Sequence, residues 1–309
     1  MNAAVVLGLD VGGSSVKYRL ASAGSSDGIP AAIAQGTVQT PKKDPVAGLA
    51  AIARDVAAGR RLVAVVVGIP GLVDEDRGTV LRSANLPALD GLALGPALSA
   101  ALDVPVGVIN DGRAAAVAEA RWGAGAGERD VFTLALGTGI AGSHIVDGRV
   151  VDGAHGIAGE LGHVVVEPSG ASCACGQRGC LETVVGAPAL RRAWNRAGGE
   201  GSPKDLLAAY EAGDERAVRV VDRGAGALAD AILTLLALVD PGVIVIGGGL
   251  ASAPHRLVVR ARALVDERAT FHRVPPIVPA TLGKWAGAVG AVAEARALHD
   301  RSPVALAAN

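Results

Sequence analysis

Short, nearly continuous apolar runs recur in the first third of the chain, and helical stretches separate them. The runs at residues 3–10, 62–68 and 105–109 are rich in Val, Ile and Leu. Runs of this length without polar alternation are typical of strands that are buried on both faces of a sheet. The stretches at 45–58 and 111–122 have helical composition. Strands that alternate with helices predict an α/β fold.

A second segment with the same design begins at residue 131. Residues 131–136 form an apolar run, a glycine turn follows, and residues 143–150 alternate apolar and polar positions. Asp147-Gly148 lies between two short apolar runs, which is a strong signal for a β-hairpin turn. The start of the chain shows the same order of features, with residues 16–20 as the returning strand. We therefore predict two similar α/β halves.

The rest of the chain is mostly helical in pattern. Residues 203–239 have helical composition, and residues 243–246 form a short apolar run ahead of three glycines. No low-complexity linker separates the two halves. We expect a smaller N-terminal α/β domain over residues 1–110 and a larger α/β domain over residues 111–284. We expect the last helix, at about 285–300, to pack back on the smaller domain.

Composition and charge exclude several classes of protein. Apolar residues make up 50% of the chain and charged residues 19%, so a large core can form. The formal net charge is −1, which removes the electrostatic case for a nucleic-acid or anionic-membrane partner. The most apolar window, residues 225–250, is interrupted by Asp230, Asp240 and Pro241, so we expect no membrane span. The start of the chain has no basic region of a secretory signal, so we expect a cytoplasmic protein.

Three predicted strands run into glycine-rich turns. Such a turn brings backbone N–H groups close to a phosphate without side-chain hindrance, although a single one is usually only a turn. Three in one chain favour a phosphate-binding role. Their residues are Gly12, Gly13 and Ser14; Gly137, Thr138 and Gly139; and Gly247, Gly248 and Gly249.

The second turn spells the dinucleotide-binding motif G-x-G-x-x-G over residues 137–142. That motif requires a helix directly after the turn, whose N-terminus faces the pyrophosphate. Here the alternating pattern of residues 143–150 predicts a strand instead. The context therefore excludes a dinucleotide-binding dehydrogenase, and the first turn does not match a P-loop.

One histidine and all three cysteines of the chain have the spacing of a metal site. His163, Cys173, Cys175 and Cys180 form the pattern H-x9-C-x-C-x4-C. Four ligands of this kind match a closed tetrahedral zinc site, which has no open position for water and is therefore structural. The alternative is three buried or reactive thiols beside an unrelated histidine.

Asn110 and Asp111 stand between a predicted strand and a predicted helix. Ligands bind at the carboxyl ends of strands in open α/β sheets, so Asp111 is a candidate catalytic base. The alternative is that Asp111 only caps the helix. We expect the helix N-terminus to lower the pKa of Asp111 and keep it ionised.

Two sets of residues resemble known families. The segments 10–17, 137–139 and 247–249 resemble the nucleotide-binding loops of the hexokinase/actin superfamily. Residues 159–163 and 173–182 closely resemble the signature of the ROK family of bacterial sugar kinases and repressors, a resemblance that extends from Gly8 to about Glu294. It implies two actin-like (ribonuclease H-like) domains with a cleft between them and a zinc-binding loop.

The same resemblance implies an ATP-dependent kinase that phosphorylates the 6-hydroxyl of a hexose with Mg²⁺. Glucose is the commonest substrate of glucokinase-like members, and other members use N-acetylmannosamine, N-acetylglucosamine, allose or fructose. The family also implies a homodimer or homotetramer.

The resemblance also implies a role for each matching residue. Asp111 would be the general base, and Asp10 would meet Mg²⁺ through water. The sugar would contact Asn85, Asn110, Asp111, Glu160, His163 and Glu182. The nucleotide would contact Gly12, Gly13, Ser14, Lys17, Gly137, Thr138, Gly139, Gly247, Gly248 and Gly249, together with Asp10.

Several positions depart from the family pattern, which usually has Thr at position 14, Gly at 141 and N-D-A-N where this chain reads Asn110-Asp111-Gly112-Arg113. These changes lie around the sugar pocket and affect the identity of the substrate.

Three alternatives remain: a family repressor, a polyphosphate-using glucokinase and a non-catalytic sugar sensor. A repressor carries a DNA-binding segment before the first glycine turn, for which ten residues leave no room. The polyphosphate branch generally lacks the cysteines, and an intact Asn110-Asp111 pair disfavours an idle sensor.

Overall fold

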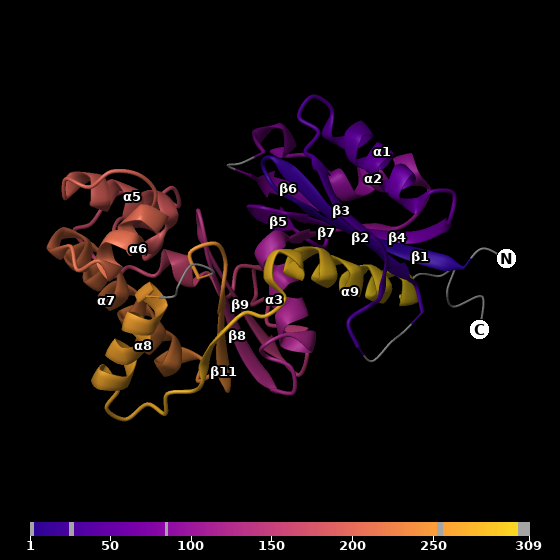
Figure 1. Cartoon of the computed structure of the whole chain (residues 1–309). Helices are drawn as coiled ribbons and strands as arrows, with labels where there is room; N and C mark the ends of the chain where they lie inside the picture. Colours follow the sequence, from indigo (N-terminus) through magenta and orange to yellow (C-terminus); the bar gives the residue numbers. More distant parts are fainter. Residues whose placement is uncertain (1–2, 25–27, 84–85, 252–255, 302–309) are drawn as a thin grey trace. The chain divides into compact units, whose positions relative to one another are not determined.

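The computed structural model of the chain describes residues 3–24, 28–83, 86–251 and 256–301 (Figure 1). Their contacts divide the chain into two compact units. The first unit comprises the described residues of Met1–Trp122 and Lys284–Asn309, and the second comprises those of Gly123–Gly283. None of the described helices is long and apolar enough to cross a membrane.

The first unit is built on a five-stranded sheet in the order β3-β2-β1-β4-β7. Neighbours are antiparallel from β3 to β1 and parallel from β1 to β7. A small β5–β6 hairpin completes its strands. The strands are β1 (Ala4–Val11), β2 (Ser15–Ser22), β3 (Ala32–Gln39), β4 (Arg61–Ile69), β5 (Leu72–Asp74), β6 (Thr79–Arg82) and β7 (Val106–Asn110). The helices are α1 (Pro45–Ala57), η1 (Pro87–Leu89), α2 (Leu94–Leu102), α3 (Asp111–Trp122) and α9 (Ala286–Asp300).

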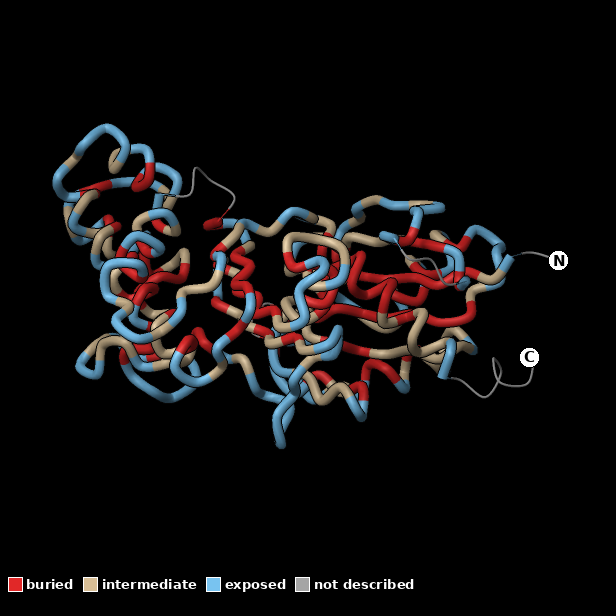
Figure 2. The backbone as a smooth tube through the Cα atoms, turned by 90° about the horizontal axis from the view of Figure 1, so that it is seen from below, coloured by how far each residue is buried: buried red, intermediate tan, exposed pale blue. Residues whose placement is uncertain are grey.

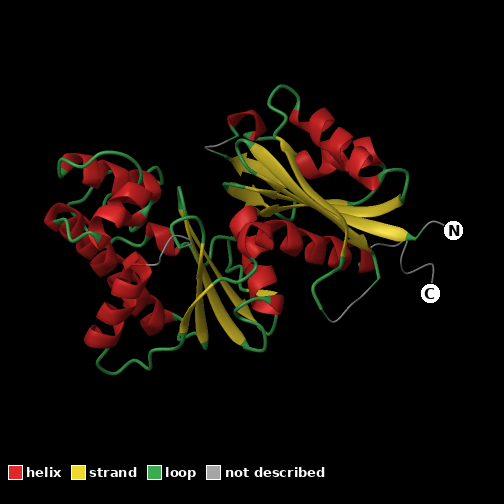
Figure 3. Ribbon diagram, in the orientation of Figure 1, coloured by secondary structure: helices red, strands yellow, loops and turns green. Residues whose placement is uncertain are grey.

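Helices cover both faces of this sheet (Figure 3). Leu7 and Leu9 of β1 belong to the core that includes residues of α1 and α2, whereas Val6 belongs to the core that includes residues of α3 and α9. This alternation along one strand is expected when both faces are buried. Near the N-terminus, Figure 2 shows runs of buried backbone with exposed segments around them.

Small residues let α9 pack closely inside the first unit. Helix α9 contacts β1, β4 and α3. At Gly290 an added Cβ would collide with the backbone carbonyl of Ala114 in α3, so the two helices can approach this closely only without a side chain there. The sequence interpretation placed a domain boundary at residue 110, before α3. The contacts place α3 in the first unit, with α9 as its neighbour.

The second unit repeats the strand arrangement of the first. Its sheet has the order β10-β9-β8-β11-β12, again antiparallel from β10 to β8 and parallel from β8 to β12. Apart from the β5–β6 hairpin, both units therefore place their third, second, first, fourth and fifth strands side by side, which confirms the predicted repeat. The strands are β8 (Asp130–Leu136), β9 (Ile140–Val146), β10 (Arg149–Val150), β11 (Val243–Gly247) and β12 (Ile277–Pro279).

The helices of the second unit share one large core with its sheet. Phe132 and Leu134 of β8 and Ile244 of β11 belong to this core, as do apolar residues of α7 and α8. The helices are η2 (Leu161–His163), α4 (Glu182–Val185), α5 (Ala187–Arg196), α6 (Pro203–Glu211), α7 (Glu215–Leu238) and α8 (Arg256–Arg268). The strand after residue 139 confirms that residues 137–142 are not a dinucleotide-binding motif.

Candidate functional site

Asp111 occupies the first turn of α3, directly after the carboxyl end of β7. Its neighbour Asn110 is the residue that caps the helix, because the Asn110 Oδ1 atom accepts a hydrogen bond of 3.0 Å from the Arg113 backbone N–H. The Asp111 Oδ1 atom accepts one of 2.8 Å from the Gly112 N–H. The structure therefore assigns the capping role to Asn110, and the capping alternative for Asp111 is wrong.

The environment of Asp111 raises its pKa to about 6. Burial is the largest cause, and the negative charge of Asp10 adds to it. The hydrogen bond from Gly112 and the charge of Lys17 act in the opposite direction but are weaker. The expectation of a lowered pKa is thus wrong, because loss of solvation outweighs the helix N-terminus. A carboxylate with a pKa near 6 is still mostly ionised at neutral pH and is a stronger base than an ordinary aspartate.

Asp10 and Lys17 form an ion pair in the same unit. They face each other across the antiparallel strands β1 and β2, with 2.8 Å between Lys17 Nζ and Asp10 Oδ2. The first turn of α9 approaches from another side, and a Cβ at Gly287 would lie 2.8 Å from the Asp10 Cγ atom. Only 13% of the Asp10 side chain is exposed. The first unit therefore gathers two partly buried carboxylates and one ammonium group.

The first glycine turn is attached to the end of the neighbouring strand β3. The Gly12 N–H donates to the Ser15 carbonyl at 2.8 Å, which closes the turn. The Thr40 hydroxyl donates to the Gly12 carbonyl at 2.6 Å, and the Thr40 N–H donates to the Ser14 carbonyl at 3.2 Å. These bonds fix the conformation of the turn that is expected to meet a phosphate.

The second and third glycine turns lie beside each other in the second unit. The third turn follows β11, and the Leu250 N–H donates to the carbonyl of Leu136, the last residue of β8, at 2.9 Å. The second turn begins at the next residue, Gly137, whose N–H donates to the Gly139 carbonyl at 2.9 Å. The fold thus brings together two turns that are about a hundred residues apart along the chain.

Glu182, at the start of α4, reaches the second glycine turn. Its Oε2 atom accepts a hydrogen bond of 2.9 Å from the Ile140 N–H, which leaves Oε1 available for another donor. The negative charge of Glu182 also acts on Glu160 and raises its pKa. Burial is the larger cause of that rise, and His163 opposes it. Three of the expected sugar contacts therefore belong to one neighbourhood.

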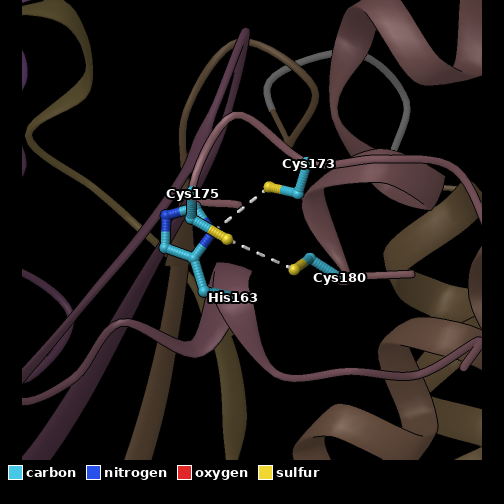
Figure 4. Close-up of side chains that lie close together, drawn as sticks. All are labelled: His163, Cys173, Cys175 and Cys180. Carbon is cyan, nitrogen blue, oxygen red and sulfur yellow. Dashed lines mark hydrogen bonds between the residues drawn. The ribbon is translucent and has the colours of Figure 1, made fainter. Parts of the chain in front are cut away.

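The predicted metal ligands converge in a loop of the second unit (Figure 4). One ligand atom from each of His163, Cys173, Cys175 and Cys180 lies within 4.8 Å of all the others. The three cysteines are free thiols, so no disulfide competes for them.

The distances among these atoms match a tetrahedral zinc site. The Sγ atoms of Cys175 and Cys180 are 3.7 Å apart, and 3.6 Å separates Cys173 Sγ from His163 Nδ1. A tetrahedron with ordinary zinc–sulfur and zinc–nitrogen bonds has S···S edges of about 3.8 Å and S···N edges of about 3.6 Å. The four side chains therefore fit a zinc ion at their centre.

Sequence reasoning did not identify Glu75 as a contact of the Asn110–Asp111 segment. Its Oε1 atom accepts a hydrogen bond of 3.1 Å from the Asn110 backbone N–H. Its Oε2 atom lies 2.9 Å from Arg113 Nη1. No local signal in the sequence connects Glu75 with Asn110. Asn85, an expected sugar contact, lies outside the described residues.

The chain is similar along nearly its whole length to glucokinases and related sugar kinases. It is 34% identical to a glucokinase of Thermotoga maritima, over 93% of this chain and 95% of that protein. It is also 34% identical to an N-acetyl-D-glucosamine kinase of Pectobacterium atrosepticum, over 73% of this chain and 77% of that protein.

Solved structures with the same fold include two members of one family. The ROK hexokinase of Thermus thermophilus superposes with a TM-score of 0.85, at 33% identity and over 94% of this chain and 97% of that one. A ROK family glucokinase of Streptomyces griseus, solved with glucose and AMPPNP, gives a TM-score of 0.78 at 29% identity, over 95% and 99% of the two chains. The ROK family model matches residues 6–297. The chain therefore belongs to the ROK family.

Proposed function

We propose that this protein is a glucokinase, which transfers the γ-phosphoryl group of ATP to the 6-hydroxyl of glucose. Its family and its relatives support an ATP-dependent sugar kinase. The observation that carries the assignment within this chain is the buried Asp111 at the carboxyl end of β7, whose pKa is about 6. An ionised, poorly solvated carboxylate at a ligand-binding edge is suited to removing a proton from a hydroxyl group.

In the proposed reaction Asp111 accepts the proton of the sugar hydroxyl. The hydroxyl oxygen forms a bond to the γ-phosphorus of ATP, the bond from that phosphorus to the bridging oxygen breaks, and ADP leaves. Asp111 then holds the proton until it passes to solvent. A proton transfer of this kind contributes about 10²–10⁴-fold in rate, and the rest must come from positioning and electrostatics.

The glycine turns and Lys17 would hold the phosphates of ATP. Backbone N–H groups and an ammonium group both stabilise negative charge, so they suit the phosphates of a nucleoside triphosphate. Mg²⁺, when bound, neutralises phosphate charge. Asp10 fits as its contact through water, because its Oδ2 atom pairs with Lys17 and its other oxygen remains for a hydration shell. These roles agree with the placement of both residues at the end of the β1–β2 hairpin.

Glu160, His163 and Glu182 would bind the hydroxyl groups of the sugar. A carboxylate oxygen accepts a hydroxyl hydrogen, and Glu182 retains Oε1 for this purpose. His163 directs Nδ1 toward Cys173, so its other ring nitrogen is the one that can reach a sugar. Zinc held by His163, Cys173, Cys175 and Cys180 would fix the orientation of this ring and stabilise the loop.

A screen for ADP release tests the choice of sugar. The purified protein would be assayed with ATP and Mg²⁺ against glucose, allose, fructose, N-acetylglucosamine and N-acetylmannosamine, and the phosphorylated position would be assigned by NMR. We expect the highest kcat/KM for glucose, with the 6-phosphate as product. A higher value for an N-acetylated hexosamine would reassign the substrate, and no turnover with any sugar would favour a non-catalytic sensor.

We also propose that the protein acts in the cytoplasm as a homodimer or homotetramer, on the strength of the family resemblance. Light scattering coupled to size-exclusion chromatography would measure the mass. A monomer at micromolar concentration would contradict the proposed assembly.

A further inference from the structure

The β5–β6 hairpin of the first unit holds the Asn110–Arg113 segment at two points. Glu75, the first residue of the hairpin turn, uses one carboxylate oxygen for the Asn110 N–H and the other for the Arg113 guanidinium. Gly71, directly before β5, accepts a hydrogen bond of 2.9 Å from the Asn110 side-chain amide. The segment that carries Asp111 is therefore attached to the hairpin before and after that residue.

The Asn110 side chain connects these two attachments. Its amide nitrogen donates to the Gly71 carbonyl. Its oxygen accepts a hydrogen bond from the Arg113 N–H in the first turn of α3. Asp111 lies between the two residues that Glu75 contacts. The backbone on both sides of Asp111 is thus held by a connected set of hydrogen bonds that includes one ion pair.

The Glu75–Arg113 pair is partly shielded from water. The Arg113 side chain is 13% exposed and that of Glu75 is 28% exposed. Removing one partner of such a pair leaves a poorly solvated charge and disturbs its surroundings. The same hairpin turn also carries the pair Arg77–Asp74, at 3.7 Å, in which Arg77 is 84% exposed. Exposed pairs of that kind contribute little, so Arg77 offers a matched control.

We propose that Glu75 and Arg113 are positioning residues for Asp111, and that their ion pair holds the carboxylate in the orientation that proton transfer requires. This inference rests on the proposed function, in which Asp111 is the base. An error of about 1 Å in the position of a reacting group can cost about 10²-fold in rate. A pair that only stabilised the fold would affect the unfolding temperature and leave turnover per folded molecule unchanged.

The test compares Arg113→Met with Arg113→Lys, which keeps the charge, and with the exposed control Arg77→Met. Each is assayed for kcat, for KM of ATP and for thermal unfolding. We expect Arg113→Met to lower kcat by at least about tenfold with KM for ATP within about twofold. Arg113→Lys should recover most of that loss, and Arg77→Met should match the unsubstituted protein. Glu75→Gln, which keeps an acceptor for the Asn110 N–H, replaces Arg113→Met if that variant does not fold.

A second comparison shows whether the pair acts through Asp111. Arg113→Met is added to Asp111→Asn, and the residual turnover is measured at high protein concentration. We expect the additional change to be less than about twofold, because residues that act through one group are not additive. An unchanged kcat in Arg113→Met, or an equal loss in both backgrounds, would overturn the inference. If Asp111→Asn itself keeps normal turnover, the proposed base is wrong, and that result is separate from either outcome for Arg113.

Discussion

The two units share one strand order but hold their candidate site residues in different ways. In the first unit, Asp111 begins a helix directly after a strand, and partly buried polar contacts hold its segment. In the second unit, Glu160 and Glu182 border residues 161–181, which contain only a short 3₁₀ helix and isolated bridges besides turns. The four candidate metal ligands lie in this loop. In the first unit the backbone of a strand and a helix and a few polar contacts place the residue, whereas an irregular loop has few backbone hydrogen bonds and depends more on a cross-link.

The largest loss of stability and sugar binding should follow from removing the proposed zinc cross-link in the second unit. Cys180→Ser replaces a buried thiol of the proposed zinc site, and the free energy of zinc binding at a structural site is largely folding free energy. We expect a sub-stoichiometric zinc content, loss of sugar binding and a marked drop in the unfolding temperature. Elemental analysis, calorimetric titration with glucose and thermal unfolding measure the three quantities.

Ser172→Ala, in the same loop but outside the ligand set, is the control and should keep one zinc per chain. Full activity of Cys180→Ser without zinc would show that the loop needs no cross-link. The loop of the second unit would then hold its site residues without a metal, as the first unit does.

The pH dependence of turnover should report mainly the ionisation of Asp111 in the first unit. Asp111 must be ionised to accept a proton, and its pKa is about 6. We therefore expect kcat/KM to be constant above pH 7 and to fall about tenfold per pH unit well below pH 6. A profile measured from pH 5 to 8 at constant ionic strength checks this. A kcat/KM that stays constant down to pH 5 would mean that Asp111 is as solvated as an ordinary aspartate.

Smaller effects should follow from two glycine substitutions in helices. In α9 a Cβ at Gly290 would collide with the backbone of α3, so Gly290→Ala should destabilise the first unit by about 1–3 kcal/mol. In α7 the nearest atom to a Cβ at Gly226 is the Arg268 Nη2 atom at 3.6 Å, which is ordinary contact. Gly226→Ala should therefore stabilise the second unit by up to about 1 kcal/mol. Denaturant unfolding measures both, and equal effects of the two substitutions would refute the close packing of α9 on α3.

Patterns over short stretches of the sequence predicted many of the strands, hairpins and helices and the candidate metal ligands. The β1–β2, β8–β9 and β9–β10 hairpins, most of the apolar parallel strands and the cysteine spacing follow from residues that are near one another in the chain. The pattern did not predict β3, the β5–β6 hairpin, α2, α8 or β12. Strand β3 is mostly exposed and carries a glycine, and α2 is short and contains Gly95 and Pro96, so neither has a clear periodic signal.

The properties of the site that the sequence did not predict arise between distant residues. The pKa of Asp111 depends on burial and on Asp10, which is a hundred positions earlier in the chain. The contact of Glu75 with Asn110 requires the β5–β6 hairpin to lie beside β7. Spacing along the chain contains no information about such distances, so the predicted direction of the pKa shift was wrong although the residue was identified.

The central claim is that Asp111 is kept buried and charged for catalysis, at a cost in stability. Its pKa rises from 3.8 to about 6 on folding, so stability falls as pH rises from about 4 to 6 and the full cost is present at pH 7. Asp111→Asn keeps an acceptor for the Gly112 N–H and removes the charge. At pH 7 we predict that turnover falls at least about 10²-fold while the free energy of unfolding rises by up to about 3 kcal/mol. Near-normal turnover, or a less stable protein, would contradict the account.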